Sequence, residues 1–120
     1  MNKPNLSIVI PTYNERENIS KMLGKLRKTL RNVKYEIIFV DDNSPDGTSD
    51  ELKFFVQKSP NIHLIHRIGR RGLSGAVIEG FFAANSELVA VMDCDLQHDE
   101  TKLSDMMNLF SKSTSLDIVI

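Results

Sequence analysis

The stretch YEIIFVDDNSPDGT, residues 35–48, begins with a run rich in β-branched and aromatic residues and continues into two adjacent aspartates and a turn. The apolar residues from Ile37 to Val40 are continuous rather than alternating, which is typical of a strand buried on both faces of a sheet. Four other runs have this character, at residues 6–10, 62–66, 88–92 and 117–120. Together the five runs indicate a parallel sheet that is covered by helices.

Helical patterns lie between these five runs. In each pattern, apolar residues recur at spacings of three and four, which gives a helix one apolar stripe. The four stripes are Ile19, Met22, Leu23, Leu26 and Leu30; Leu52, Phe55 and Val56; Ile78, Phe81 and Phe82; and Leu103, Met106, Met107 and Phe110. Alternating strands and helices predict an α/β domain with a mainly parallel sheet, right-handed crossovers and helices on both faces.

Composition limits the possible functions. The 120 residues are 41% hydrophobic and 26% charged, which is ordinary for one compact globular domain. Lys and Arg number 15 against 16 Asp and Glu, so no excess of charge attracts the chain to nucleic acid or to anionic lipid. A single cysteine, Cys94, excludes an internal disulfide framework and suits a reducing compartment.

The sequence shows no targeting or membrane-spanning segment. Its apolar runs are far shorter than the ~20 residues that cross a bilayer, and the polar start MNKPN is unlike a secretory signal. We therefore expect a cytoplasmic protein. The last expected strand reaches Ile120, the final residue, whereas domains usually finish at the surface. We therefore expect residues 1–120 to be truncated at the C-terminus.

Ligands of open α/β sheets bind at the carboxyl ends of the strands, so the segments that follow each strand are the informative ones. After the first strand, Asn14 and Glu17 predict a helix start with a capping-box-like pair. That interpretation leaves Tyr13 unexplained, an aromatic side chain on which a flat base could stack.

Adjacent carboxylates, Asp41 and Asp42, follow the second strand. Residues 44–47 predict a turn, and Thr48 or Ser49 is the expected cap of the next helix. The two carboxylates repel each other unless hydrogen-bond donors or a cation relieve them, and the N–H of a nucleobase is such a donor.

The segment RIGRRGLSGAVIEG, residues 67–80, follows the third strand and holds three arginines and four glycines. Glycine lets the backbone approach a ligand closely, and arginine pairs with phosphate. The segment lacks the Gly-Lys-Ser or Gly-Lys-Thr of a Walker loop. The alternative is a flexible surface loop with solvated arginines.

The segment VMDCDLQHDE, residues 91–100, places Asp93, Asp95 and Gln97 on one side of an extended backbone. Hard oxygen ligands in this arrangement suit Mg²⁺ or Mn²⁺ and leave positions open for phosphate oxygens. Asp99 is the better candidate for the cap of the next helix. Cys94 is expected to point inward as a small apolar residue.

The segments PTYNERENI, VDDNSPDGT, RRGLSGAVIEG and MDCDLQHDE, in this order, resemble the family 2 glycosyltransferases of the GT-A fold. Within that family, the chain is most similar to the dolichyl-phosphate and polyprenyl-phosphate mannosyltransferases. The resemblance implies that residues 1–120 are the Rossmann-like, nucleotide-sugar-binding portion of an inverting, metal-dependent transferase. It also implies GDP-mannose as donor, a lipid phosphate as acceptor and Mg²⁺ or Mn²⁺ as cofactor.

The resemblance also assigns roles to residues. It implies that Asp95 is catalytic, and that Arg67, Arg70 or Arg71 faces nucleotide or phosphate, with Arg71 taken as the contact. The implied nucleotide contacts are Pro11, Tyr13, Glu15, Val40, Asp42, Arg71 and Asp93, and the implied metal ligands are Asp93, Asp95 and Gln97.

A dedicated general base is not required by a lipid phosphate acceptor. A phosphate monoester has a second pKa near ~6 and is largely dianionic at neutral pH. Consistently, the sequence offers no convincing base among Glu79, His63 and His66. An acceptor of this kind also makes the cytoplasmic face of a membrane an alternative location.

Several alternatives stay open from the sequence. The donor could be a UDP-sugar, because Asp42 can accept one N–H from uracil or two from guanine, and the chain could bind donor without turnover. A strand edge at Ile120 leaves a homodimer open. A receiver-type signalling domain is disfavoured because its acidic pair follows the first strand, and an Asp-x-Asp-x-Thr phosphatase because Gln97 replaces the threonine.

Overall fold

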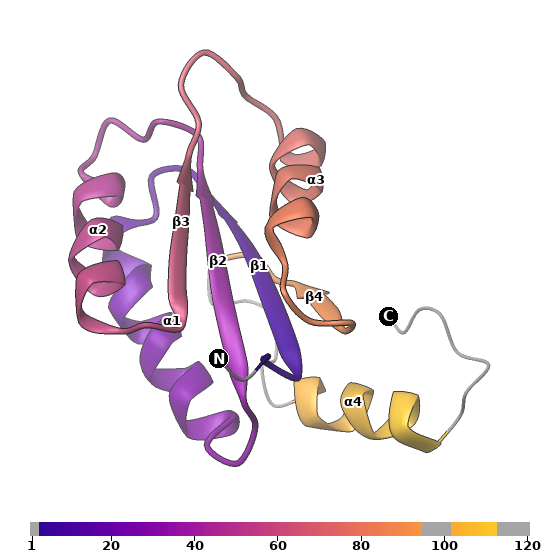
Figure 1. Cartoon of the computed structure of the whole chain (residues 1–120). Helices are drawn as coiled ribbons and strands as arrows, with labels where there is room; N and C mark the ends of the chain where they lie inside the picture. Colours follow the sequence, from indigo (N-terminus) through magenta and orange to yellow (C-terminus); the bar gives the residue numbers. More distant parts are fainter. Residues whose placement is uncertain (1–2, 95–101, 113–120) are drawn as a thin grey trace.

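The computed structural model describes residues 3–94 and 102–112. The expected strand at 117–120 and the candidate residues Asp95, Gln97 and Asp99 lie outside these ranges. Strands and helices alternate along the chain (Figure 1). The elements are β1 (Leu6–Thr12), α1 (Arg16–Thr29), β2 (Tyr35–Asp41), α2 (Thr48–Lys58), β3 (Ile62–His66), α3 (Leu73–Ala83), β4 (Val89–Val91) and α4 (Lys102–Lys112).

The four strands form one parallel sheet in the order β3-β2-β1-β4. Leu6 to Thr12 of β1 pair in register with Tyr35 to Asp41 of β2, and Ser7 pairs with Val89 at the start of β4. The chain adds β2 and β3 on one side of β1 and then returns to place β4 on the other side. The carboxyl ends of β1, β2 and β4 therefore meet where the strand order reverses, which is where α/β sheets bind ligands.

One face of the sheet carries the larger core. The five stripe residues of α1 are each 5% exposed or less, as expected from their spacing. They pack with Ile8, Ile10 and Phe39 of the sheet, with Leu52 of α2 and with Leu103 of α4. The predicted apolar stripe is therefore confirmed for α1 and α2, and in part for α4.

The opposite face is covered by α3 (Figure 1), and this helix packs on the sheet through small residues. Ala76 and Gly80 are its buried positions, and a Cβ at residue 80 would lie 2.3 Å from Cγ1 of Val9 on β1. The predicted stripe is wrong here, because Ile78, Phe81 and Phe82 are 52%, 47% and 87% exposed. Close contact of the helix backbone with the sheet requires the small residues to face inward, which turns the large ones outward.

The prediction that each strand is buried on both faces is also wrong for β4. Val89 and Val91 are 37% and 40% exposed, whereas Ala90 packs against the larger core. The smaller core under α3 draws its strand residues from Val9, Ile38, Val40 and Ile65, which belong to β1, β2 and β3. That face of β4 is consequently left uncovered among the described residues. No helix in the described part of the chain is long and apolar enough to cross a membrane.

A buried carboxylate ties the α3–β4 connection to the amino end of the sheet. Glu36 accepts hydrogen bonds from Ser7 Oγ (2.5 Å) and from the backbone and side-chain nitrogens of Asn85 (2.6 and 2.9 Å). His63 Nε2 lies 3.2 Å from the same carboxylate. Burial alone would raise the pKa of Glu36, but these hydrogen bonds and the charge of His63 outweigh it and leave the pKa lowered.

Candidate functional site

A cavity of about 230 Å³ lies at the carboxyl end of the sheet, where the strand order reverses. It is bounded by the ends of β1, β2 and β4 and by the first turn of α3. Its lining residues are Pro11, Thr12, Tyr13, Glu15, Asp42, Leu73, Ala76, Asp93 and Cys94. The structure thus brings together five of the residues expected to contact nucleotide, whereas Val40 is fully buried beneath them. Cys94 is buried as expected.

The connection after β1 is held by the connection after β2. The backbone N–H of Asn14 donates to Ser44 Oγ (2.9 Å), and that of Glu15 donates to Thr48 Oγ1 (3.1 Å). The predicted capping pair of Asn14 and Glu17 is wrong: Asn14 has a left-handed φ of 55°, and α1 begins at Arg16 without a side-chain cap. Asparagine tolerates this conformation better than most residues. The tight turn leaves Tyr13 43% exposed at the cavity.

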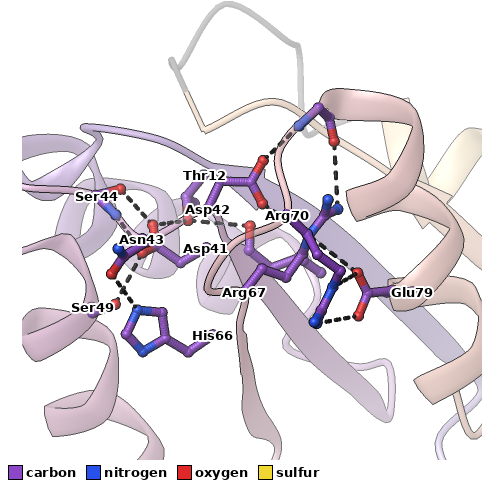
Figure 2. A network of polar contacts seen from close by, with 12 residues as sticks. Thr12, Asp41, Asp42, Asn43, Ser44, Ser49, His66, Arg67, Arg70 and Glu79 are labelled. Atoms are coloured by element: carbon purple, nitrogen blue, oxygen red, sulfur yellow. Dashed lines mark hydrogen bonds and ion pairs between the residues drawn. The ribbon is translucent and has the colours of Figure 1, made fainter.

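Asp41 is a structural carboxylate. It is fully buried and accepts hydrogen bonds from Thr12 Oγ1 (2.8 Å), Ser49 Oγ (2.9 Å) and both the N–H and Oγ of Ser44 (3.0 and 2.6 Å) (Figure 2). Hydrogen-bond donors therefore relieve this member of the acidic pair without any ligand.

The start of α2 depends on Asp46 rather than on the predicted caps. Gly47 takes a φ of 91° before the helix, and Asp46 accepts hydrogen bonds from the N–H and hydroxyl of Thr48. Burial alone would raise the pKa of Asp46, but these bonds outweigh it and lower the pKa. Thr48 and Ser49 are thus part of the first helical turn, and the prediction that either caps it is wrong.

Asp42 faces the cavity with one oxygen free of hydrogen bonds. Its Oδ2 accepts the N–H of Gly72 (3.0 Å), and its Oδ1 lies 3.2 Å from Nε of Arg67. The geometry of that second contact gives an ion pair without a hydrogen bond, so the buried Oδ1 has no hydrogen-bond partner. The positive charge of Arg67 compensates this oxygen, which has almost no accessible surface. The oxygen of Asp42 that suits a ligand with an N–H group is therefore Oδ2.

The three arginines of the β3–α3 segment have different surroundings. Arg67 is 3% exposed and lies between Asp42 and Glu79, and the exposed Arg70 pairs with Glu79 at 3.1 Å (Figure 2). The guanidinium carbon of Arg71 lies 5.3 Å from the centre of the Tyr13 ring. Arg71 therefore lies beside Tyr13, which lines the cavity, but is not itself a lining residue. The ion pairs of Glu79 could not be predicted from the sequence. Glu79 lies on α3, twelve residues after Arg67, and only the packing of the helix brings the two side chains together.

The expected metal ligands are described only in part. Asp93 lines the cavity and supplies a carboxylate, the hard oxygen donor that Mg²⁺ and Mn²⁺ prefer. Asp95 and Gln97 are not among the described residues. Within residues 3–94 and 102–112, no three His, Cys, Asp or Glu side chains converge as a metal site. The described part of the site therefore contains one of the three expected ligands, Asp93, and its carboxylate fits such a metal.

A second hollow, of about 300 Å³, shares no lining residue with this cavity. It is lined by Arg16, Gly47, Asp50, Glu51 and Phe54. None of the expected nucleotide or metal residues that the structure describes contributes to it.

Comparison with known proteins decides the family. A sequence model of Glycosyl transferase family 2 matches residues 7–119. The chain belongs to this family. It is 37% identical over 113 residues to a dolichol-phosphate mannosyltransferase of Pyrococcus furiosus, a match that covers 94% of this chain and 32% of the relative.

Two further relatives support the subgroup and the fold. A dolichol-phosphate mannosyltransferase of Saccharomyces cerevisiae is 39% identical over 95 residues, covering 77% of this chain and 36% of the relative. A mannosyltransferase of Pyrobaculum calidifontis, solved in complex with GDP-Man and Mn²⁺, superposes with a TM-score of 0.72 at 26% identity, covering 89% of this chain and 32% of that one. The likeness confirms the expected GT-A-type sheet, and this family 2 chain spans about a third of the length of these relatives.

Proposed function

We propose that this chain is the donor-binding part of a glycosyltransferase that transfers mannose from GDP-mannose to a dolichyl or polyprenyl phosphate. The observation that carries the proposal is the cavity that combines an aromatic ring, a carboxylate paired with a buried arginine and a second carboxylate. These groups, on Tyr13, Asp42 and Asp93, match the three parts of a nucleotide diphosphate complex: a flat base, its N–H groups and a metal-bound diphosphate.

In this account the base lies on Tyr13 and donates to Asp42. An aromatic ring and a base stack through their faces, and Oδ2 of Asp42, which accepts the N–H of Gly72, has a second lone pair for the N–H of the base. Arg71, beside the same ring, brings positive charge to the mouth of the cavity. Pro11, Glu15 and Val40 contact the nucleotide or support those that do.

Asp93, Asp95 and Gln97 hold a divalent metal at the diphosphate end. The Mn²⁺ in the related Pyrobaculum mannosyltransferase supports a metal of this kind, with Mg²⁺ as the alternative. When bound, the metal stabilises the negative charge that develops on the departing diphosphate. Asp95 is the carboxylate that we assign to catalysis through this role.

The acceptor is proposed from the names of the relatives, which are dolichol-phosphate and polyprenol-phosphate mannosyltransferases. A phosphate monoester is mostly dianionic above its second pKa of ~6, so it attacks without a dedicated base. Among the described residues, Glu79 is engaged by Arg67 and Arg70, which is consistent with that account. A lipid acceptor requires the reaction to take place at a membrane surface, and we propose the cytoplasmic face.

Calorimetric titration of the chain with GDP, UDP and ADP tests the proposal. Each nucleotide is added with Mn²⁺ and again with a chelator. We expect GDP to bind best and to lose affinity with the chelator. Stronger binding of UDP would replace GDP-mannose with a UDP-sugar, and no binding of any nucleotide would contradict the assigned donor site. Binding without mannosyl transfer to dolichyl phosphate would identify a donor module that does not turn over alone.

A further inference from the structure

The buried guanidinium of Arg67 lies between two carboxylates behind the cavity. Its Nε is 3.2 Å from Oδ1 of Asp42 and 3.1 Å from Oε2 of Glu79. On the outer side, Arg70 contacts Glu79 at 3.1 Å. Positive and negative groups therefore alternate from the cavity to the surface (Figure 2). A buried arginine needs such pairing, because an unpaired charge in the protein interior is costly.

The contact between Arg67 and Asp42 is one of charge rather than of hydrogen bonding. Nε carries a single N–H, which cannot point at both carboxylates, and neither Nε nor Oδ1 of Asp42 has a hydrogen bond. The guanidinium donates instead from Nη1 to the carbonyl of Gly72 (3.5 Å). Arg67 thus stabilises the carboxylate charge on the buried side of Asp42 and leaves Oδ2 as its accepting oxygen.

Gly75, in the first turn of α3, makes room for this arrangement. A Cβ at residue 75 would lie 3.1 Å from Nη2 and 3.2 Å from Nη1 of Arg67, which is tighter than ordinary contacts. The absence of a side chain at Gly75 therefore leaves space for the guanidinium of Arg67. The sequence had suggested instead that glycines of this segment approach a ligand.

We propose that Arg67 is a positioning residue, held by Glu79 and accommodated by Gly75, that holds Oδ1 of Asp42 on the buried side and so presents Oδ2 to the N–H of a nucleobase. The inference rests on the proposed function, in which Asp42 contacts the base. Arg67 itself does not touch the nucleotide. Glu79 is required because it holds the guanidinium in the place from which Arg67 orients Asp42.

The test compares GDP with inorganic pyrophosphate, which carries no base. In Glu79→Gln the side chain keeps its shape and loses its charge, so we expect the guanidinium to shift and to turn Asp42 away from the orientation that the base requires. GDP affinity then falls about tenfold, the scale of one hydrogen bond to a charged group. Affinity for pyrophosphate with Mn²⁺ is expected to be unchanged. Glu87→Gln, at an exposed position near the opposite end of the sheet, is the matched control.

Gly75→Ala gives an independent route, because it crowds the same guanidinium without changing any charge. We expect it also to weaken GDP and to spare pyrophosphate, with thermal unfolding confirming that each variant is folded. Wild-type affinity for GDP in both variants would overturn the inference, as would equal losses of GDP and pyrophosphate, which indicate a structural role. If the wild-type chain binds pyrophosphate and no nucleotide, the proposed function fails, and the inference fails with it.

Discussion

Asp41 and Asp42 are neighbours in the chain, yet the first is fully buried among hydroxyl donors and the second lines the cavity beside Arg67. Successive side chains of an extended segment point in opposite directions, which separates the two carboxylates. One of them can therefore build the connection after β2 while the other remains available to a ligand.

Asp41→Asn is expected to act on stability. The amide has one acceptor oxygen where Asp41 serves donors from Thr12, Ser44 and Ser49. Leaving a buried donor unsatisfied costs about 1–3 kcal/mol of unfolding free energy. Asp42→Asn is its matched partner, and we expect it to lower GDP affinity more than stability. Denaturant unfolding measures stability and calorimetry measures GDP affinity. The two assigned roles would be refuted if Asp41→Asn mainly lowered GDP affinity and Asp42→Asn mainly lowered stability.

Tyr13→Ala is expected to weaken GDP and UDP by similar factors. Stacking of a base on an aromatic ring contributes about 1–3 kcal/mol and depends little on the base. Tyr13→Phe keeps the ring and should bind nearly as well as wild type. Phe54→Ala, which removes a half-exposed ring that lines the other hollow, is the control. Unchanged affinity in Tyr13→Ala would remove this residue from the base site.

Asp95→Asn is expected to weaken metal-dependent nucleotide binding more than it weakens folding. The carboxylate is an expected metal ligand, and an amide is a poorer ligand for a hard divalent cation. The measurement is GDP affinity with Mn²⁺ and with chelator, beside the unfolding temperature. Equal GDP affinities for mutant and wild type in Mn²⁺ would be incompatible with the metal assignment.

Gly80→Ala is expected to destabilise the fold. The added Cβ would lie 2.3 Å from Cγ1 of Val9, and overpacking of this kind costs about 1–3 kcal/mol. Gly24→Ala is the matched control in α1, where a Cβ meets nothing within 4 Å. Alanine is the better helix former, so that variant should gain up to about 1 kcal/mol. Urea unfolding gives both values, and equal stabilities would argue against the close packing of α3 on β1.

Glu36→Gln is expected to lower stability at neutral pH and to lose this effect in acid. The pKa of Glu36 is lowered in the folded state, so its contribution is complete above the unfolded pKa of ~4.3 and is lost as the pH falls through the folded value. Unfolding free energies of variant and wild type from pH 7 to pH 3 should therefore converge. A constant difference across that range would contradict the role of the charge.

Hydrophobic patterns predicted the elements better than they predicted which residues are buried. The stripe of α1 was correct because large apolar residues fill the space between a helix and the sheet. On α3 the same spacing was misleading, because Ala76 and Gly80 bring the backbone too close for Phe81 or Phe82 to fit beneath it. A stripe of large residues identifies a helix, but close packing on a sheet can select the small residues instead.

The site was predicted from strand ends, because a parallel sheet brings these together at one edge. That reasoning correctly grouped Tyr13, Asp42 and Asp93 at one cavity. It could not separate the roles of the arginines, which depend on side-chain directions set by Glu79 and Gly75 on α3. Capping also failed at Asn14, because a left-handed turn delays the start of α1.

The most direct test of the central claim is to locate nucleotide binding residue by residue. The ¹⁵N-labelled chain is titrated with GDP and Mg²⁺, and backbone amide signals are followed by NMR. The account predicts the largest shifts at Tyr13, Asp42, Gly72 and Asp93, which surround the cavity at the switch point of the sheet. Shifts concentrated at Asp50, Glu51 and Phe54, around the other hollow, would contradict it.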